Sequence, residues 1–264
     1  MKRFTKRTVV MMLATLMMIS MAACSGPTGE QKEYFDAQDK TLSYTNYDIE
    51  YTIFTDYKDP EGNQTSSPDM THTTQLKSSD DGKVRSSSQT IASGLSSVVS
   101  DSYLIDGYVY SDFLGQGVKS EYEEGSNFYE LKFMQIPIDA VGDDFKVSTE
   151  GETKVYTFSL ADGKFDFLYD TFDGQIDEDN QKITAASVTA VEGNDGELES
   201  MEITATVEGV EEEQDEDAEE DAEPVVGDSG TATFQVSFNY MGGFVKVDQP
   251  DSLANYQDIN NLFG

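Results

Sequence analysis

Few side chains in this sequence could take part in catalysis or metal binding, and this limits the chemistry that it supports. His72 is the only histidine and Cys24 is the only cysteine. A Ser-His-Asp or Cys-His mechanism would therefore run through one histidine in a stretch rich in Ser and Thr, and a zinc ion would lack its usual ligands. We interpret His72 as a surface side chain. We predict that the protein is not an enzyme and that it holds no metal and no cofactor.

Carboxylates are abundant, and their abundance weakens any catalytic assignment. Asp166 and Asp170 fall on one predicted helix, where two carboxylates could in principle serve a glycosidase. Because the chain has 51 acidic residues, some pair always has a suitable spacing. The acidic clusters at 177–180 and 211–221 also lack the Asp-x-Asp-x-Asp-Gly order and closing Glu of a calcium loop. We assign no catalytic residue among them.

The charge balance excludes one class of partner. The chain has 17 basic and 51 acidic residues, which gives a net charge of −34. Such a field repels phosphate backbones and anionic lipid head groups. We therefore expect no nucleic-acid binding, and we predict a monomer.

Cys24 is best explained as a membrane anchor. Residues 1–23 contain a basic start, a short apolar run and two alanines directly before the cysteine, which is typical of an export signal. The apolar run is shorter than the roughly 20 residues that a spanning helix needs. The alternative is an ordinary secretory signal with Cys24 as an incidental thiol. Met21-Ala22-Ala23-Cys24 resembles the lipobox of bacterial lipoproteins. This resemblance implies a lipid on Cys24 and a protein held on the extracytoplasmic face of a bacterial cell membrane.

The elements that follow the cysteine are mostly strands. Residues 24–40 read as a tether and a short helix, and residues 41–250 form the folded domain. Apolar side chains alternate with polar ones in the predicted strands. These strands cover 47–53, 70–76, 84–91, 155–160, 183–191, 197–207 and 231–240.

Two local patterns stand out within this domain. Asp106-Gly107 lies between two short aromatic and β-branched arms at 103–110, which predicts a hairpin with a tight primed turn. Phe165, Leu168, Tyr169 and Phe172 follow at helical spacing and predict an amphipathic helix. A second helical segment is expected to cross the sheet over 122–138 and to end at Pro137.

The last third of the chain is predicted to form an antiparallel meander that is interrupted by an acidic segment. Residues 208–230 hold three closely spaced acidic runs, and we predict a disordered insertion there. It serves either as a solvated loop that maintains solubility or as a docking site for a cationic partner. Residues 251–264 form a C-terminal tail.

The order of these elements, together with the 103–110 hairpin and the anchor motif at Met21-Ala22-Ala23-Cys24, resembles the LolA/LppX-like lipoproteins. In particular, the sequence resembles small lipoproteins of Gram-positive bacteria that carry a domain of unknown function with this fold. It implies an α+β fold with a strongly curved antiparallel sheet, an incomplete barrel, and helices packed on its concave side. Some members of this family carry lipids or lipoproteins in the apolar space between the sheet and the helices. The acidic insertion departs from that pattern.

Two functions follow as hypotheses. In the first, a non-catalytic lipoprotein binds a hydrophobic small molecule, such as a lipid or acyl chain, under the helices. In the second, a cell-surface or structural lipoprotein with a filled core binds a protein or an envelope component. For the first hypothesis, the candidate lining residues are Tyr108, Val109, Phe165, Leu168, Tyr169, Phe172, Met201 and Phe238.

Overall fold

The structure is a computed structural model, and it describes most of the chain that follows the predicted signal. The described residues are 27, 29–66, 70–79, 83–93, 95–113, 116–122, 131–210, 226–250 and 253–258. Cys24, residues 1–23 and the acidic run at 211–225 lie outside them. Within the described part of the chain, no helix is both long and apolar enough to span a membrane.

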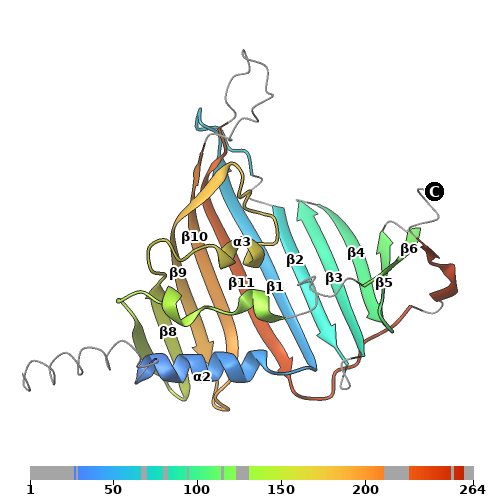
Figure 1. Ribbon diagram of the computed structural model, residues 1–264, viewed down its shortest axis with the longest axis horizontal. Helices are drawn as coiled ribbons and strands as arrows, with labels where there is room; N and C mark the ends of the chain where they lie inside the picture. Colours follow the sequence, from blue (N-terminus) through green and yellow to red (C-terminus); the bar gives the residue numbers. More distant parts are fainter. Residues whose placement is uncertain are drawn as a thin grey trace, which may run out of the picture.

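The described strands form one curved, twelve-stranded sheet that does not close (Figure 1). Its strand order is β12-β6-β5-β4-β3-β2-β1-β11-β10-β9-β8-β7, and every described pairing is antiparallel except that of β12 with β6. The strands are β1 (Tyr47–Lys58), β2 (Met70–Ser78), β3 (Val84–Ser93), β4 (Ser96–Ile105), β5 (Tyr108–Phe113), β6 (Gln116–Glu121), β7 (Lys146–Glu150), β8 (Thr153–Ser159), β9 (Gln181–Glu192), β10 (Leu198–Gly209), β11 (Ser229–Met241) and β12 (Gln257–Asp258).

The described helical segments are short and few. They are α2 (Glu30–Leu42), α3 (Phe167–Thr171) and the 3-10 turns η2 (Leu131–Met134), η3 (Ile138–Ala140) and η4 (Leu253–Asn255). All but η4 lie against one face of the half of the sheet that contains β1 and β8 to β11 (Figure 1). We call this the inner face and the opposite one the outer face.

Two predicted helices differ from the structure. The described part of the predicted crossing helix at 122–138 contains one 3-10 turn, η2, and η3 begins at its last residue, because its apolar residues have no helical period and Pro137 separates the two turns. The predicted helix at 165–172 is only the five residues of α3, because Asp173 and Gly174 take positive φ angles of 48° and 74° and end it. The predicted strands and the 103–110 hairpin are confirmed, and most strands are longer than predicted.

The core lies between the inner face and these helices. Ile53, Tyr51 and Ile49 of β1 pair with Phe234, Val236 and Phe238 of β11, so their side chains share the inner face. All six are buried. Rings cluster around Phe234, whose centroid lies 5.3 Å from that of Tyr51, 6.3 Å from that of Phe133 and 6.5 Å from that of Phe172. This cluster joins β1, β11, η2 and α3 into one packed unit.

Helix α2 is attached to the core through buried polar side chains, among them Gln38. The Tyr34 hydroxyl donates to Gln38 Oε1 at 3.0 Å. Gln38 also accepts from the backbone N–H of Ile136 at 2.9 Å and donates to the Ile136 carbonyl at 3.1 Å. One side chain of α2 thereby satisfies both backbone groups of a residue in the segment between η2 and η3.

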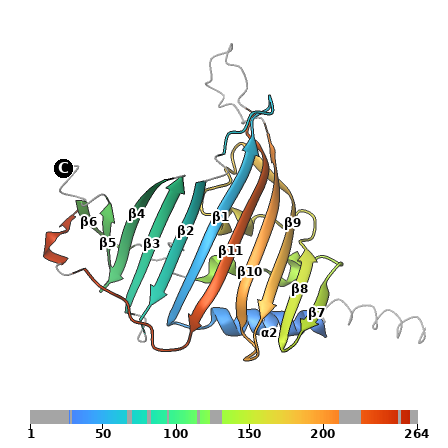
Figure 2. The same ribbon diagram turned by 180° about the vertical axis from the view of Figure 1, so that it is seen from behind.

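The strands β3 to β6, which we call the wing, extend beyond the helices (Figures 1 and 2). On the outer face of the wing, the ring of Tyr256 packs edge-on against Tyr110 at 5.5 Å. A Cβ on Gly117 would approach Tyr256 to 2.9 Å, so only glycine leaves room for this ring. The C-terminal segment thus covers the outer face of the wing near its edge, where β12 pairs with β6.

Candidate functional site

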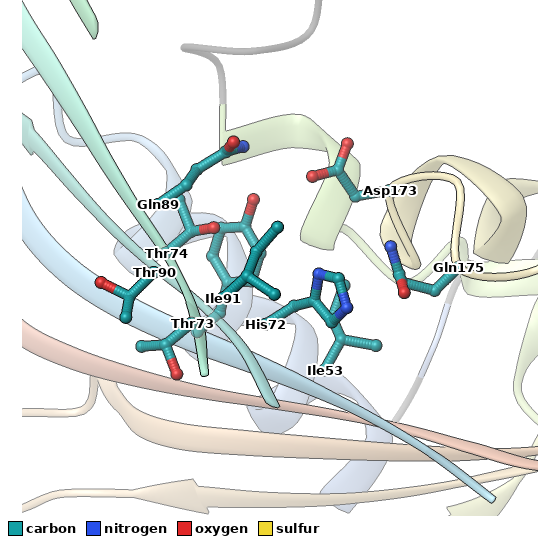
Figure 3. A pocket seen from close by; sticks show the side chains of 10 residues that line it. Ile53, His72, Thr73, Thr74, Gln89, Thr90, Ile91, Asp173 and Gln175 are labelled. Carbon is teal, nitrogen blue, oxygen red and sulfur yellow. The ribbon is translucent and has the colours of Figure 1, made fainter. Parts of the chain in front are cut away.

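A hollow of about 320 Å³ opens on the inner face where the packed core gives way to the wing (Figure 3). It lies between β1, β2 and β3 on one side and the turn after α3 on the other. The lining residues are Tyr51, Ile53, His72, Thr73, Thr74, Gln89, Thr90, Ile91, Asp173 and Gln175.

The floor of the hollow follows from the strand register. Ile53 pairs with His72, and His72 pairs with Ile91, so these three side chains form one row across β1, β2 and β3 on the inner face. Ile53 is buried, His72 is half-buried and Ile91 is 43% exposed. The Tyr51 ring lies in the neighbouring row. The floor is therefore mixed, with Tyr51, Ile53 and Ile91 beside His72, Thr74 and Gln89. The exposure of the row from Ile53 to Ile91 increases toward the wing.

The opposite wall is polar, and it comes from the turn that ends α3. Figure 3 shows Asp173 and Gln175 across the hollow from Ile91 and His72. Surrounding protein raises the pKa of Asp173 above the ordinary Asp value, although the residue keeps an exposed surface. A hydrogen bond from Tyr51 and the nearby His72 oppose this rise. Burial, followed by the charge of Asp173, raises the pKa of Tyr51 to about 12.

Replacing Asp173 by Asn is expected to stabilise the protein more at pH 7 than at pH 4. The pKa of Asp173 is raised in the folded state, so the folded state holds this proton more tightly than the unfolded state does. The proton therefore stabilises the fold below the ordinary pKa of Asp, and this stabilisation is lost as the pH rises through the raised pKa. Asn removes the charge and tolerates the positive φ at this position. Thermal melts of the two proteins across this pH range measure the difference.

The expected difference is small, because solvent screens an exposed group. Asp170→Asn is the matched control, since Asp170 is exposed on the preceding turn of the same short helix. Both substitutions remove one negative charge from a strongly acidic chain. An equal gain in melting temperature at every pH for the two variants would show that the raised pKa of Asp173 does not cause the pH dependence.

The structure places the eight residues predicted to line a ligand site in three settings. Phe165, Leu168, Phe172, Met201 and Phe238 are buried in the core, and Tyr169 is half-buried beside it. The Tyr169 hydroxyl donates to the Gln181 carbonyl at 3.2 Å.

The remaining two residues lie on β5 in the wing. The Val109 position shares the inner face, whereas Tyr108 lies on the outer face beside Lys119, whose Nζ is 3.8 Å from its ring centroid. The structure thus brings six of the eight residues together and leaves two apart. Their contact with a ligand stays a prediction.

Sequence reasoning did not include His72 or Asp173 in the site. His72 was interpreted as a surface side chain, but it is half-buried in the hollow. Its alternation with the buried strand residues Thr74 and Leu76 was the available signal. The signal for Asp173 was the Asp-Gly pair directly after the apolar stripe, which marks a helix end beside the core.

Comparisons with known proteins return solved structures alone. No protein-family model matches the chain, and no curated protein matches it. The chain is similar in structure to a LolA superfamily protein, NE2245 from Nitrosomonas europaea, with a TM-score of 0.27 and 8% identity over 85% of this chain and 96% of that chain. It is also similar to LprF from Mycobacterium bovis, with a TM-score of 0.42 and 10% identity over 86% of this chain and all of that chain.

The class of fold follows from the described sheet itself. It is large, curved, mostly antiparallel and unclosed, with few helices, which agrees with the incomplete barrel that we expected from the resemblance.

Proposed function

We propose that this protein is a lipid-anchored, extracytoplasmic binding protein that takes a hydrophobic or amphipathic ligand, such as an acyl chain, in the hollow beside the wing. The observation that carries the proposal is the pair of isoleucines in the floor of this hollow, Ile53 and Ile91, because Ile91 continues into the exposed Val98 on the same face. In this proposal the inner face is the concave face of the sheet, and the anchor is the lipid on Cys24.

The size and lining of the hollow suit such a ligand. Its volume of about 320 Å³ falls at the lower end of the range of about 300–1,000 Å³ that is common for small-molecule sites. Ile91 pairs with Val98 of β4, and the two side chains are 43% and 41% exposed. A ligand longer than the hollow would cover these two side chains and remove their apolar surface from water.

The polar wall favours an amphipathic ligand with a head group that is not anionic. Asp173, Gln175 and Gln89 offer one carboxylate and two amides around the hollow. These groups form hydrogen bonds to hydroxyl or amine groups. Asp173 and the net charge of −34 oppose an anionic head group.

Ile91→Asp is expected to weaken the binding of a fluorescent acyl-chain probe with a neutral head group about tenfold or more. The substitution removes an apolar contact and places a second carboxylate across the hollow from Asp173, and losing one buried apolar side chain changes affinity by roughly this factor. Titration of the full chain in a mild non-ionic detergent measures the change. Native mass spectrometry and organic extraction of the unmodified protein then identify what copurifies.

Val99→Asp is the matched control for this experiment. Val99 lies on the same hairpin and is 49% exposed, but it is on the outer face and does not line the hollow. Its variant is expected to bind the probe as the unmodified chain does. Failure of the unmodified chain to bind the probe, together with a ligand-free mass, would overturn the proposal.

A further inference from the structure

The end of the β3–β4 hairpin differs in composition from the rest of the chain. Residues 86–100 contain no Asp, Glu, Lys or Arg, although these four types make up 26% of the chain. The uncharged stretch is bounded by Arg85 and Asp101. It includes the parts of β3 and β4 farthest from α2, at the opposite end of the sheet (Figures 1 and 2).

Apolar side chains are exposed on every side of this hairpin end. Ile91 and Val98 lie on the inner face and Val99 on the outer face, and each is 41–49% exposed. Leu95 lies in the turn between the strands and is fully exposed. We call these four residues the hairpin tip.

The tip extends past β5, whereas β2 flanks it on the other side, where Met70 pairs with Ser93. The described pairing of β4 with β5 begins at Ser100 and Phe113, so the β4 residues of the tip have their partners on β3 alone. Ser93 and Ser96 close the hairpin. The tip therefore lacks a described neighbouring strand on its β5 side alone.

We propose that the hairpin tip inserts into the surface of a lipid bilayer. A protein partner that docks on a sheet covers one face, whereas the exposed apolar residues here lie on both faces and at the turn. A bilayer surrounds an inserted element and covers all three sides. The absence of charge across 86–100 removes the repulsion that the acidic chain otherwise meets at a membrane surface, and it avoids the cost of placing charges among acyl chains.

The tip adjoins the proposed ligand site, because Ile91 belongs to both. A ligand could therefore pass along the inner face from the bilayer into the hollow without crossing charged surface. This transfer role rests on the proposed function, whereas insertion does not. The tip lies at the opposite end of the sheet from α2 (Figure 1).

A tryptophan introduced at the tip tests insertion directly, because the chain has none. Leu95→Trp in the full chain is expected to shift its fluorescence to the blue on addition of phosphatidylcholine vesicles and to be quenched by brominated acyl chains. The probe reports its own surroundings, so the anchor elsewhere in the chain does not produce this signal. Phe244→Trp is the control, since Phe244 is 82% exposed and lies outside the hairpin.

A second substitution separates the tip from the hollow. Val99→Asp in the Leu95→Trp background is expected to weaken the vesicle response about tenfold while leaving the binding of the soluble probe unchanged. The absence of a vesicle response from Leu95→Trp, or an equal response from Phe244→Trp, would overturn insertion. A vesicle response from a chain that binds no acyl probe would support insertion and refute the proposed ligand site.

Discussion

Phe234→Ala is expected to lower the free energy of unfolding by about 3–5 kcal/mol, the range for removing a buried aromatic ring. Phe234 is fully buried, and its ring contacts those of Tyr51, Phe133 and Phe172. The loss has two parts, the transfer of the ring out of water and the cavity that it leaves. The cavity closes poorly here, because β1 and β10 pair with β11 on both sides and fix its backbone. Denaturant unfolding followed by circular dichroism measures the change.

Phe54→Ala is the control for this prediction. Phe54 lies one position from Ile53 on β1, but on the outer face, and it is 36% exposed. Its truncation is expected to lower the free energy of unfolding by about 1 kcal/mol or less. Equal losses for the two variants would show that the rings around Phe234 do not form the centre of the core.

Gln38→Leu is expected to destabilise the protein by about 2–4 kcal/mol, although it replaces a polar side chain in the core by an apolar one of similar size. The Ile136 N–H and carbonyl would both lose their partner, and each buried group left unpaired costs about 1–3 kcal/mol. The Tyr34 hydroxyl would lose its acceptor on Gln38 as well. Unfolding in urea at neutral pH measures the loss.

Gln135→Leu provides the comparison within the same segment. Gln135 is exposed, and its side chain makes only a long contact of 3.5 Å with Asp39. A change within about 0.5 kcal/mol is expected. A neutral effect of Gln38→Leu would indicate that water or a shifted backbone satisfies Ile136.

The strand content was predictable because it depends on local alternation. In β1 and β11 the alternating residues Ile49, Tyr51 and Phe234 are buried, as the pattern indicates. Turn chemistry was equally informative. Asp106 and Gly107 take φ angles of 51° and 81°. A tight primed turn requires positive φ angles at both central residues, and Asp-Gly was predicted as the turn because this pair accepts them.

Long-range pairing and packing were not predictable in this way. No local pattern states that β1 pairs with β11, because both strands would look the same beside other neighbours. Lys146–Glu150 has one large apolar residue in five, so β7 gave no alternation signal. The sequence also does not distinguish a Phe172 that is buried in the core from one that lines a cavity. Only the three-dimensional packing shows that the hollow lies beside His72 and Asp173 and not beside Phe172.

The central position of β1 has a consequence for how the chain folds. Strands β1 to β6 pair in sequence order, and so do β7 to β11, but the seam between β1 and β11 joins segments from opposite ends of the domain. Local hairpins form in microseconds, whereas long-range strand pairing is slow. We therefore expect two half-sheets to form first and the seam to set the folding rate. Until Met241 is available, the seam edge of β1 remains unpaired, and that edge is the part of the nascent chain most exposed to aggregation.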